Sequence, residues 1–173
     1  MRYCGISPRS LALHAMTALL VAACARTPVI DKETEQAQNQ PALPAYPKSA
    51  DLVSVDIGGN FDYFIDPDSI RIVGGVVQYT VVARSRAGAT NISFEGLRCR
   101  TLEHKLYAFG RPDATWSPSR NADWDNPRNS SGTYYSVLAD YFFCPDARPV
   151  QNVAEAVRAL KLGRHPATVP RTY

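Results

Sequence analysis

The sequence has 173 residues, of which 45% are hydrophobic and 20% charged, and its formal net charge is +3. Two of the 19 basic residues, Arg2 and Arg9, lie in an N-terminal stretch typical of a removable leader, which leaves 17 basic against 16 acidic residues. This balance excludes the basic surface that a nucleic-acid-binding protein needs, so we expect no nucleic-acid partner.

Residues 1–23 have the features of a secretory signal peptide. Basic residues come first, an apolar stretch follows over residues 11–23, and no acidic residue precedes Asp31. The apolar stretch is shorter than the roughly 20 residues of a membrane-spanning helix. The sequence therefore predicts export and removal of the leader.

Cys24 ends the sequence "LVAAC", which resembles the lipobox of bacterial lipoproteins. The resemblance implies that the Cys24 thiol is lipidated and becomes the first residue of the mature protein, with the membrane as its partner. Ordinary cleavage after Ala23 or Ala25 is the alternative. Because no aspartate follows Cys24, we expect an outer-membrane lipoprotein that faces the periplasm, with exposure at the cell surface as the alternative.

Residues 24–50 predict a lipidated N-terminus followed by a flexible tether. This segment is rich in proline and glutamine and has almost no apolar periodicity. The following residues 51–163 have the length of one domain with one core. We expect residues 164–173 to be a disordered tail.

The domain begins with an alternating pattern typical of β-strands. Strands are predicted over residues 61–65 and 70–73, with the turn sequence "DPDS" at residues 66–69 between them. Gly74-Gly75 predicts a tight hairpin into a long strand over residues 77–83. These elements form an antiparallel meander.

Two further strands follow. The apolar positions change parity between Phe94 and Leu97, which predicts a β-bulge at Gly96. Leu102, Leu106 and Ala108 then alternate as in a fifth strand.

A polar stretch over residues 111–132 contains both tryptophans. A loop of this length inside a compact domain is typically functional or mobile. Aromatic and arginine side chains dominate the energetics of interfaces, so the loop offers a candidate binding patch: Trp116, Trp124, Arg111, Arg120 and Arg128. The alternative is that both indoles cover the edge of the sheet.

Helical spacing of apolar residues predicts helices over residues 134–143 and 150–160, the second ending at Gly163. The aromatic sequence "YYSVL" at the start of the first is also compatible with a strand. The expected fold is α+β, an antiparallel sheet of about five or six strands with two helices on one face.

Four cysteines are present. Removal of the leader takes Cys4, and lipidation uses Cys24, so Cys99 and Cys144 remain in an oxidising compartment. We expect these two to form a disulfide.

The sequence contains no recognisable catalytic constellation. The motifs G-x-S-x-G and H-E-x-x-H are absent, His104 lies in a strand between charged residues, and His165 lies in the tail. We expect a surface or structural role for both histidines, and no catalytic residue, cofactor or metal site.

The sequences "YFIDPDSI", "YTVVARS" and "FEGLRC", with the later cysteine, resemble the cryptic neisserial protein-like family of proteobacterial lipoproteins. The resemblance covers roughly residues 51–150 and implies an envelope protein of a Gram-negative bacterium, but it supplies no catalytic residue or ligand. The order of elements is more distantly similar to the surface-adhesin protein E family, whose members are outer-membrane lipoproteins that bind host matrix proteins.

The expected function is a non-catalytic binding or assembly module tethered to the outer membrane, with an envelope protein as partner. A surface adhesin that binds host proteins is the second hypothesis. A small periplasmic enzyme is the third, and it lacks a visible set of acid, base or nucleophile residues.

Overall fold

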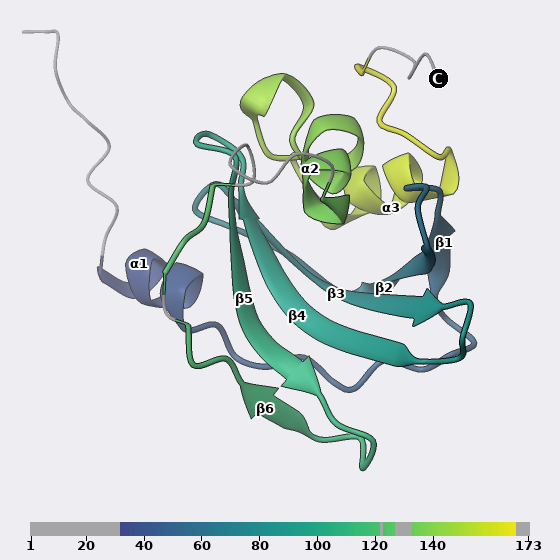
Figure 1. The fold of residues 1–173 in the computed structure, drawn as a ribbon. Coiled ribbons are helices and arrows are strands. Elements are labelled where there is room, and N and C mark those ends of the chain that lie inside the picture. Colours follow the sequence, from purple (N-terminus) through teal and green to yellow (C-terminus); the bar gives the residue numbers. More distant parts are fainter. Residues whose placement is uncertain (1–31, 122, 127–132, 169–173) are drawn as a thin grey trace, which may run out of the picture. The chain divides into compact units, whose positions relative to one another are not determined.

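The computed structural model describes residues 32–121, 123–126 and 133–168 (Figure 1). All of these residues belong to one compact unit of the chain. The expected signal peptide and Cys24 lie outside the described residues. Within the described ranges, no helix is long and apolar enough to cross a membrane.

Six antiparallel strands form one curved sheet in the order of the sequence (Figure 1). The strands are β1 (Val53–Val55), β2 (Phe61–Val73), β3 (Val76–Ser85), β4 (Thr90–Arg98), β5 (Glu103–Gly110) and β6 (Trp116–Pro118). The Gly74-Gly75 hairpin joins β2 to β3 with φ angles of 57° and 91°, which glycine adopts without steric cost. The predicted α+β fold with an antiparallel meander is confirmed.

The helices are α1 (Lys32–Asn39), α2 (Tyr134–Leu138) and α3 (Val153–Lys161). A π-helical turn, η2 (Ala139–Phe143), continues α2, and a 3₁₀ turn, η3 (Pro145–Ala147), follows. The helices α2 and α3 lie on the same side of the sheet (Figure 1). This confirms the two predicted helices and excludes a strand at "YYSVL"; α1 was not predicted.

We call the face of the sheet that α2, η2 and α3 cover the inner face. Alternate residues of β3, among them Val77 and Tyr79, pack there against η2 residues Phe142 and Phe143, and all four are fully buried. Each large apolar side chain removed from water in this way contributes about 2–3 kcal/mol. The predicted disulfide between Cys99 and Cys144 is present in this core, with an S–S distance of 2.04 Å.

The C-terminal end of the domain extends past α3. The Asn152 side chain caps α3 by accepting a hydrogen bond from Glu155 N at 2.9 Å, and Gly163 ends the helix with φ of 73°. His165 is buried, and its Nε2 lies 2.9 Å from Glu155 Oε1. The prediction of a disordered tail from residue 164 is therefore wrong for residues 164–168.

The sequence "DPDS" forms a bulge rather than a turn. β2 continues through it, and the register with β3 shifts between Asp66 and Arg71. Ser69 fills the gap, because its Oγ donates to Asp66 O and accepts from Thr80 N, both at 2.7 Å. The turn-forming residues thus interrupt the ladder without reversing the chain.

The irregularity predicted at Gly96 lies on the neighbouring strand. Glu95 pairs with Leu106 and Phe94 with Ala108, so Tyr107 is the extra residue, on β5. The apolar parity of β4 changes because both faces of the sheet are covered there: Phe94 points to the outer face and Leu97 to the inner face. The change in parity therefore needs no bulge in β4.

The outer face is covered by residues 32–47, which we call the N-terminal segment. Side chains of the sheet donate to its backbone carbonyls: Gln78 to Ala37 O, Tyr107 to Gln38 O, Arg71 to Ala42 O and Trp116 to Pro44 O, at 2.6–2.9 Å. The flexible tether predicted over residues 24–50 is therefore wrong for this segment. Backbone acceptors hold it in place, and its own sequence does not show them.

Candidate functional site

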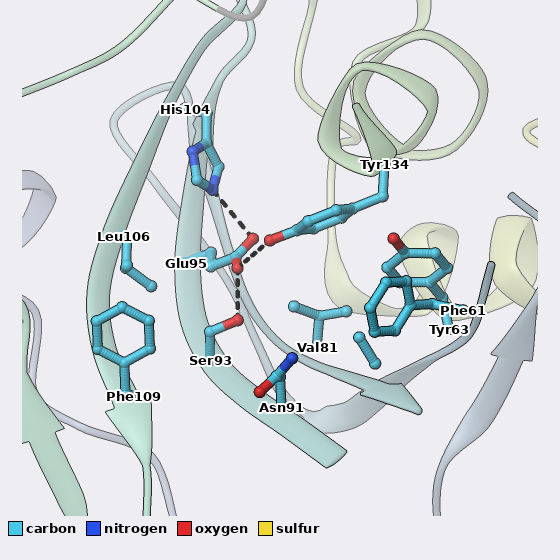
Figure 2. Close-up of a pocket in the computed structure, with 11 residues that line it drawn as sticks. Phe61, Tyr63, Val81, Asn91, Ser93, Glu95, His104, Leu106, Phe109 and Tyr134 are labelled. Carbon is cyan, nitrogen blue, oxygen red and sulfur yellow. Dashed lines mark hydrogen bonds and ion pairs between the residues drawn. The ribbon is translucent and has the colours of Figure 1, made fainter. Parts of the chain in front are cut away.

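A cavity of about 420 Å³ opens on the inner face beside α2 (Figure 2). Its walls are apolar and come from the start of β2, the end of β3 and the end of β5, with Phe61, Tyr63, Val81, Leu106 and Phe109 among them. Its floor is polar and consists of Ser93, Glu95, His104 and Tyr134. A volume of this size is typical of a small-molecule site.

Strand register brings the floor together. Glu95 lies between Tyr79 on β3 and Leu106 on β5, and all three side chains point to the inner face. Tyr134 reaches the floor from the first turn of α2, where it stacks on Tyr63 with ring centroids 5.0 Å apart. The floor therefore joins the sheet to the helical layer.

Glu95 is 1% exposed and accepts hydrogen bonds on both carboxylate oxygens. Its Oε1 accepts from Ser93 Oγ at 2.5 Å and from the Tyr134 hydroxyl. Its Oε2 accepts from the Tyr79 hydroxyl at 3.1 Å and lies 3.0 Å from His104 Nε2. One carboxylate thus has four hydrogen-bonding partners, of which Figure 2 shows Ser93, His104 and Tyr134.

These contacts control the ionisation of Glu95. Burial alone would raise the pKa of Glu95, but hydrogen bonds from His104, Ser93 and Tyr134, together with the His104 charge, outweigh it and hold this pKa below its ordinary value. Burial and the negative charge of Glu95 raise the pKa of Tyr134 far above its usual range. At neutral pH, Glu95 is ionised and Tyr134 keeps its proton.

His104 is fixed on three sides. Its backbone exchanges two hydrogen bonds with Asp125, at 2.7 and 2.8 Å. Its ring stacks on Tyr135 with centroids 4.1 Å apart and an interplanar angle of 5°. Since Nε2 faces Glu95, the ring orients the carboxylate and is held by it.

An ionised carboxylate can only accept hydrogen bonds. The hydroxyls of Ser93, Tyr79 and Tyr134 must therefore donate their single protons to Glu95, and their remaining lone pairs can only accept. A carboxylate with four partners has no free lone pair with which to take a proton from another molecule. The floor can hold a ligand, and its arrangement does not resemble a general base ready to act.

The model of the CNP1-like family matches residues 31–161. The chain belongs to the CNP1-like family. The match confirms the resemblance seen in the sequence and extends it to the N-terminal segment and to α3. No curated protein and no solved structure matches this CNP1-like chain.

The predicted binding patch of the CNP1-like chain is distributed over the edge of the sheet. Trp116 Nε1 donates to Pro44 O at 2.9 Å, and Trp124 Nε1 donates to Asn39 Oδ1 at 3.0 Å. Both indoles therefore hold the N-terminal segment, as the covering alternative expects. The patch as a binding surface stays a prediction.

The predicted arginines of the patch do not converge. Arg111 is exposed and donates to Ser117 Oγ at 3.0 Å, Arg120 is exposed, and Arg128 lies outside the described residues. Two cations cover the Trp124 indole: the guanidinium carbon of Arg98 lies 4.0 Å from the ring centroid, and Lys105 Nζ lies 5.7 Å from it. Neither was among the predicted residues.

No three His, Cys, Asp or Glu side chains gather where they could hold a metal ion, as far as the described residues of the CNP1-like chain extend.

The sequence reasoning missed Glu95 and Tyr134. The sequence did contain a signal for Glu95: it lies two positions before Leu97 on β4, so both side chains point to the inner face. A charged residue at an inward strand position requires buried partners.

Proposed function

We propose that this CNP1-like chain is an exported lipoprotein of the outer membrane, that its domain faces the periplasm, and that it binds a ligand without chemical turnover. The ligand site is the cavity above Glu95. The adhesin hypothesis has no feature of the described residues in its favour, and the candidate loop is engaged with the N-terminal segment.

The observation that carries the binding role is the saturation of Glu95. Enzymes that use a carboxylate as a base leave it a free lone pair directed at the substrate. Here all four hydrogen bonds to Glu95 come from the protein itself. This arrangement gives a rigid floor beneath an open apolar cavity.

The envelope location rests on the leader and Cys24, and the disulfide supports it. Disulfides persist in exported proteins and are rare in reducing compartments. Cys99 and Cys144 are buried in the core, so the bond contributes to the fold itself. Metabolic labelling with a clickable fatty acid tests the anchor: wild type should be labelled and Cys24→Ser should not.

Native mass spectrometry of protein extracted from its own cells tests the binding role. We expect an added mass on wild type that is released as the unchanged compound. Ala83→Phe should abolish it, because Ala83 lines the cavity and a phenyl ring would fill it. Ala154→Phe, at an exposed position of α3, is the matched control and should retain the mass. An added mass retained by Ala83→Phe, or none on wild type, contradicts the proposal.

A further inference from the structure

We propose that the cavity takes a small molecule with an apolar body and a head that donates hydrogen bonds, either a neutral hydroxyl or an ammonium, and that it rejects carboxylates and phosphates. This inference rests on the proposed function, since it names the ligand class of the same cavity. The residues that decide it are Ser93, Glu95 and Tyr134.

The walls select an apolar body. Aromatic rings stand on both sides of the cavity, Phe61 and Tyr63 on one and Phe109 beside Leu106 on the other, with Val81 between the two sides (Figure 2). Phe109 is 51% exposed at the rim and Phe61 is 36% exposed, so the rings are open to a ligand. Rings of this kind favour a flat or chain-like hydrocarbon part.

The floor selects the head group. Ser93 and Tyr134 line the cavity, and both donate their protons to Glu95. What they can offer a ligand is a lone pair, which a hydroxyl or ammonium satisfies and a carboxylate cannot. An anion placed against these two hydroxyls would meet two acceptors and receive a hydrogen bond from neither.

Charge reinforces this selection. The carboxylate of Glu95 lies directly behind the two hydroxyls, and no lysine or arginine is among the described residues that line the cavity. The His104 ring already directs Nε2 at Glu95. The Asn91 amide and the Tyr63 hydroxyl also line the cavity, and each can both donate and accept, so neither reverses the preference.

Three probes with the same phenylbutyl body test the inference: 4-phenylbutylamine, 4-phenylbutanol and 4-phenylbutanoate. Residues 31–173, which form a compact unit with their own core and disulfide, are titrated with each probe, and backbone amide shifts are followed by NMR. We expect the amine and the alcohol to shift Ser93, Glu95 and Phe109, with dissociation constants at least tenfold below that of the carboxylate. Equal or tighter binding of the carboxylate overturns the inference, and so does binding of none of the three.

Two variants locate the effect. Ala83→Phe should weaken the amine and the alcohol at least tenfold, whereas Ala154→Phe should leave both unchanged. Glu95→Gln removes the charge and should reduce the preference for amine over carboxylate to threefold or less. If Glu95→Gln does not fold, Ala83→Phe still decides whether the cavity is the site. A ligand found on protein from cells together with a wrong order of probes would reject the ligand class and leave the binding role standing.

Discussion

Gly96 lies directly beneath the phenol of Tyr107: a Cβ atom on Gly96 would come within 2.5 Å of the Tyr107 hydroxyl oxygen and 2.9 Å of its ring carbons. The same hydroxyl donates to Gln38 O at 2.6 Å and so holds α1 against the outer face. A missing side chain on β4 therefore makes room for the contact between β5 and the N-terminal segment.

Gly96→Ala should destabilise the domain by about 1–3 kcal/mol, because the added methyl overpacks a fully occupied site. Urea denaturation measures the change. The double variant Gly96→Ala with Tyr107→Leu should show less than the sum of the two single losses, since the clash is then relieved. A loss below about 0.5 kcal/mol for Gly96→Ala would show that Tyr107 can move aside.

Glu95→Gln should destabilise the domain by about 3 kcal/mol at neutral pH, because the buried amide nitrogen cannot accept a hydrogen bond and leaves the donors that face it without an acceptor. The folded-state pKa of Glu95 lies below its unfolded value. The stabilisation by the charged form is therefore complete above the unfolded pKa of about 4.3 and is lost as the pH falls through the folded-state pKa.

Urea denaturation of wild type and Glu95→Gln at several pH values between about 7 and 3 measures this dependence. The difference between the two proteins should shrink at the acidic end. The matched control is Glu35→Gln, at an exposed position of α1, which should differ little from wild type throughout. A difference that grows with acidity would show that Glu95 is protonated in the folded state.

Replacing both disulfide cysteines, Cys99→Ala with Cys144→Ala, should lower the free energy of unfolding. Because 45 positions separate the two residues, the chain-entropy model predicts a loss of about 4 kcal/mol. Intact mass before and after reduction and alkylation checks that wild type carries the bond. Unchanged stability of the double variant would mean that packing in the inner core compensates for the lost cross-link.

Trp116→Phe should loosen the N-terminal segment. The change keeps most of the aromatic contact with Phe94 but removes the hydrogen bond to Pro44 O, at a cost of about 1 kcal/mol. Backbone ¹⁵N relaxation at Ala42, Leu43, Ala45 and Tyr46 should show larger motions. Phe109→Leu, on the inner face, is the control and should leave the relaxation unchanged. Unaltered relaxation in Trp116→Phe would show that the indole does not hold the segment.

Local patterns predict much of the sheet. Alternation along β3, the Gly74-Gly75 hairpin and the helical spacing after residue 134 are properties of short stretches, and the structure contains all of them. The disulfide followed from counting the cysteines that export would leave. By contrast, "DPDS" has the local chemistry of a turn, and only its pairing with β3 makes it a bulge.

The site depends on relationships that no short stretch contains. Tyr134 and Glu95 lie 39 positions apart, and they meet only because α2 packs on the inner face. The packing of the N-terminal segment on the sheet could not be predicted from the sequence for a related reason. Four of the donors that hold the segment are side chains on β2, β3, β5 and β6, and what they bond there are carbonyl groups that every residue has.

This mode of attachment has a consequence for how the sequence can diverge. Most residues of the segment are held through their carbonyl oxygens and tolerate replacement of their side chains; the exceptions include Gln38 and Asn39, whose side chains bond Gly74 O and Trp124 Nε1. The donors Gln78, Tyr107 and Trp116 do not tolerate replacement in the same way. We therefore expect the first residues of the domain to drift quickly in related proteins. In a related protein, the three donors on the strands indicate that the N-terminal segment is present more reliably than the sequence of the segment does.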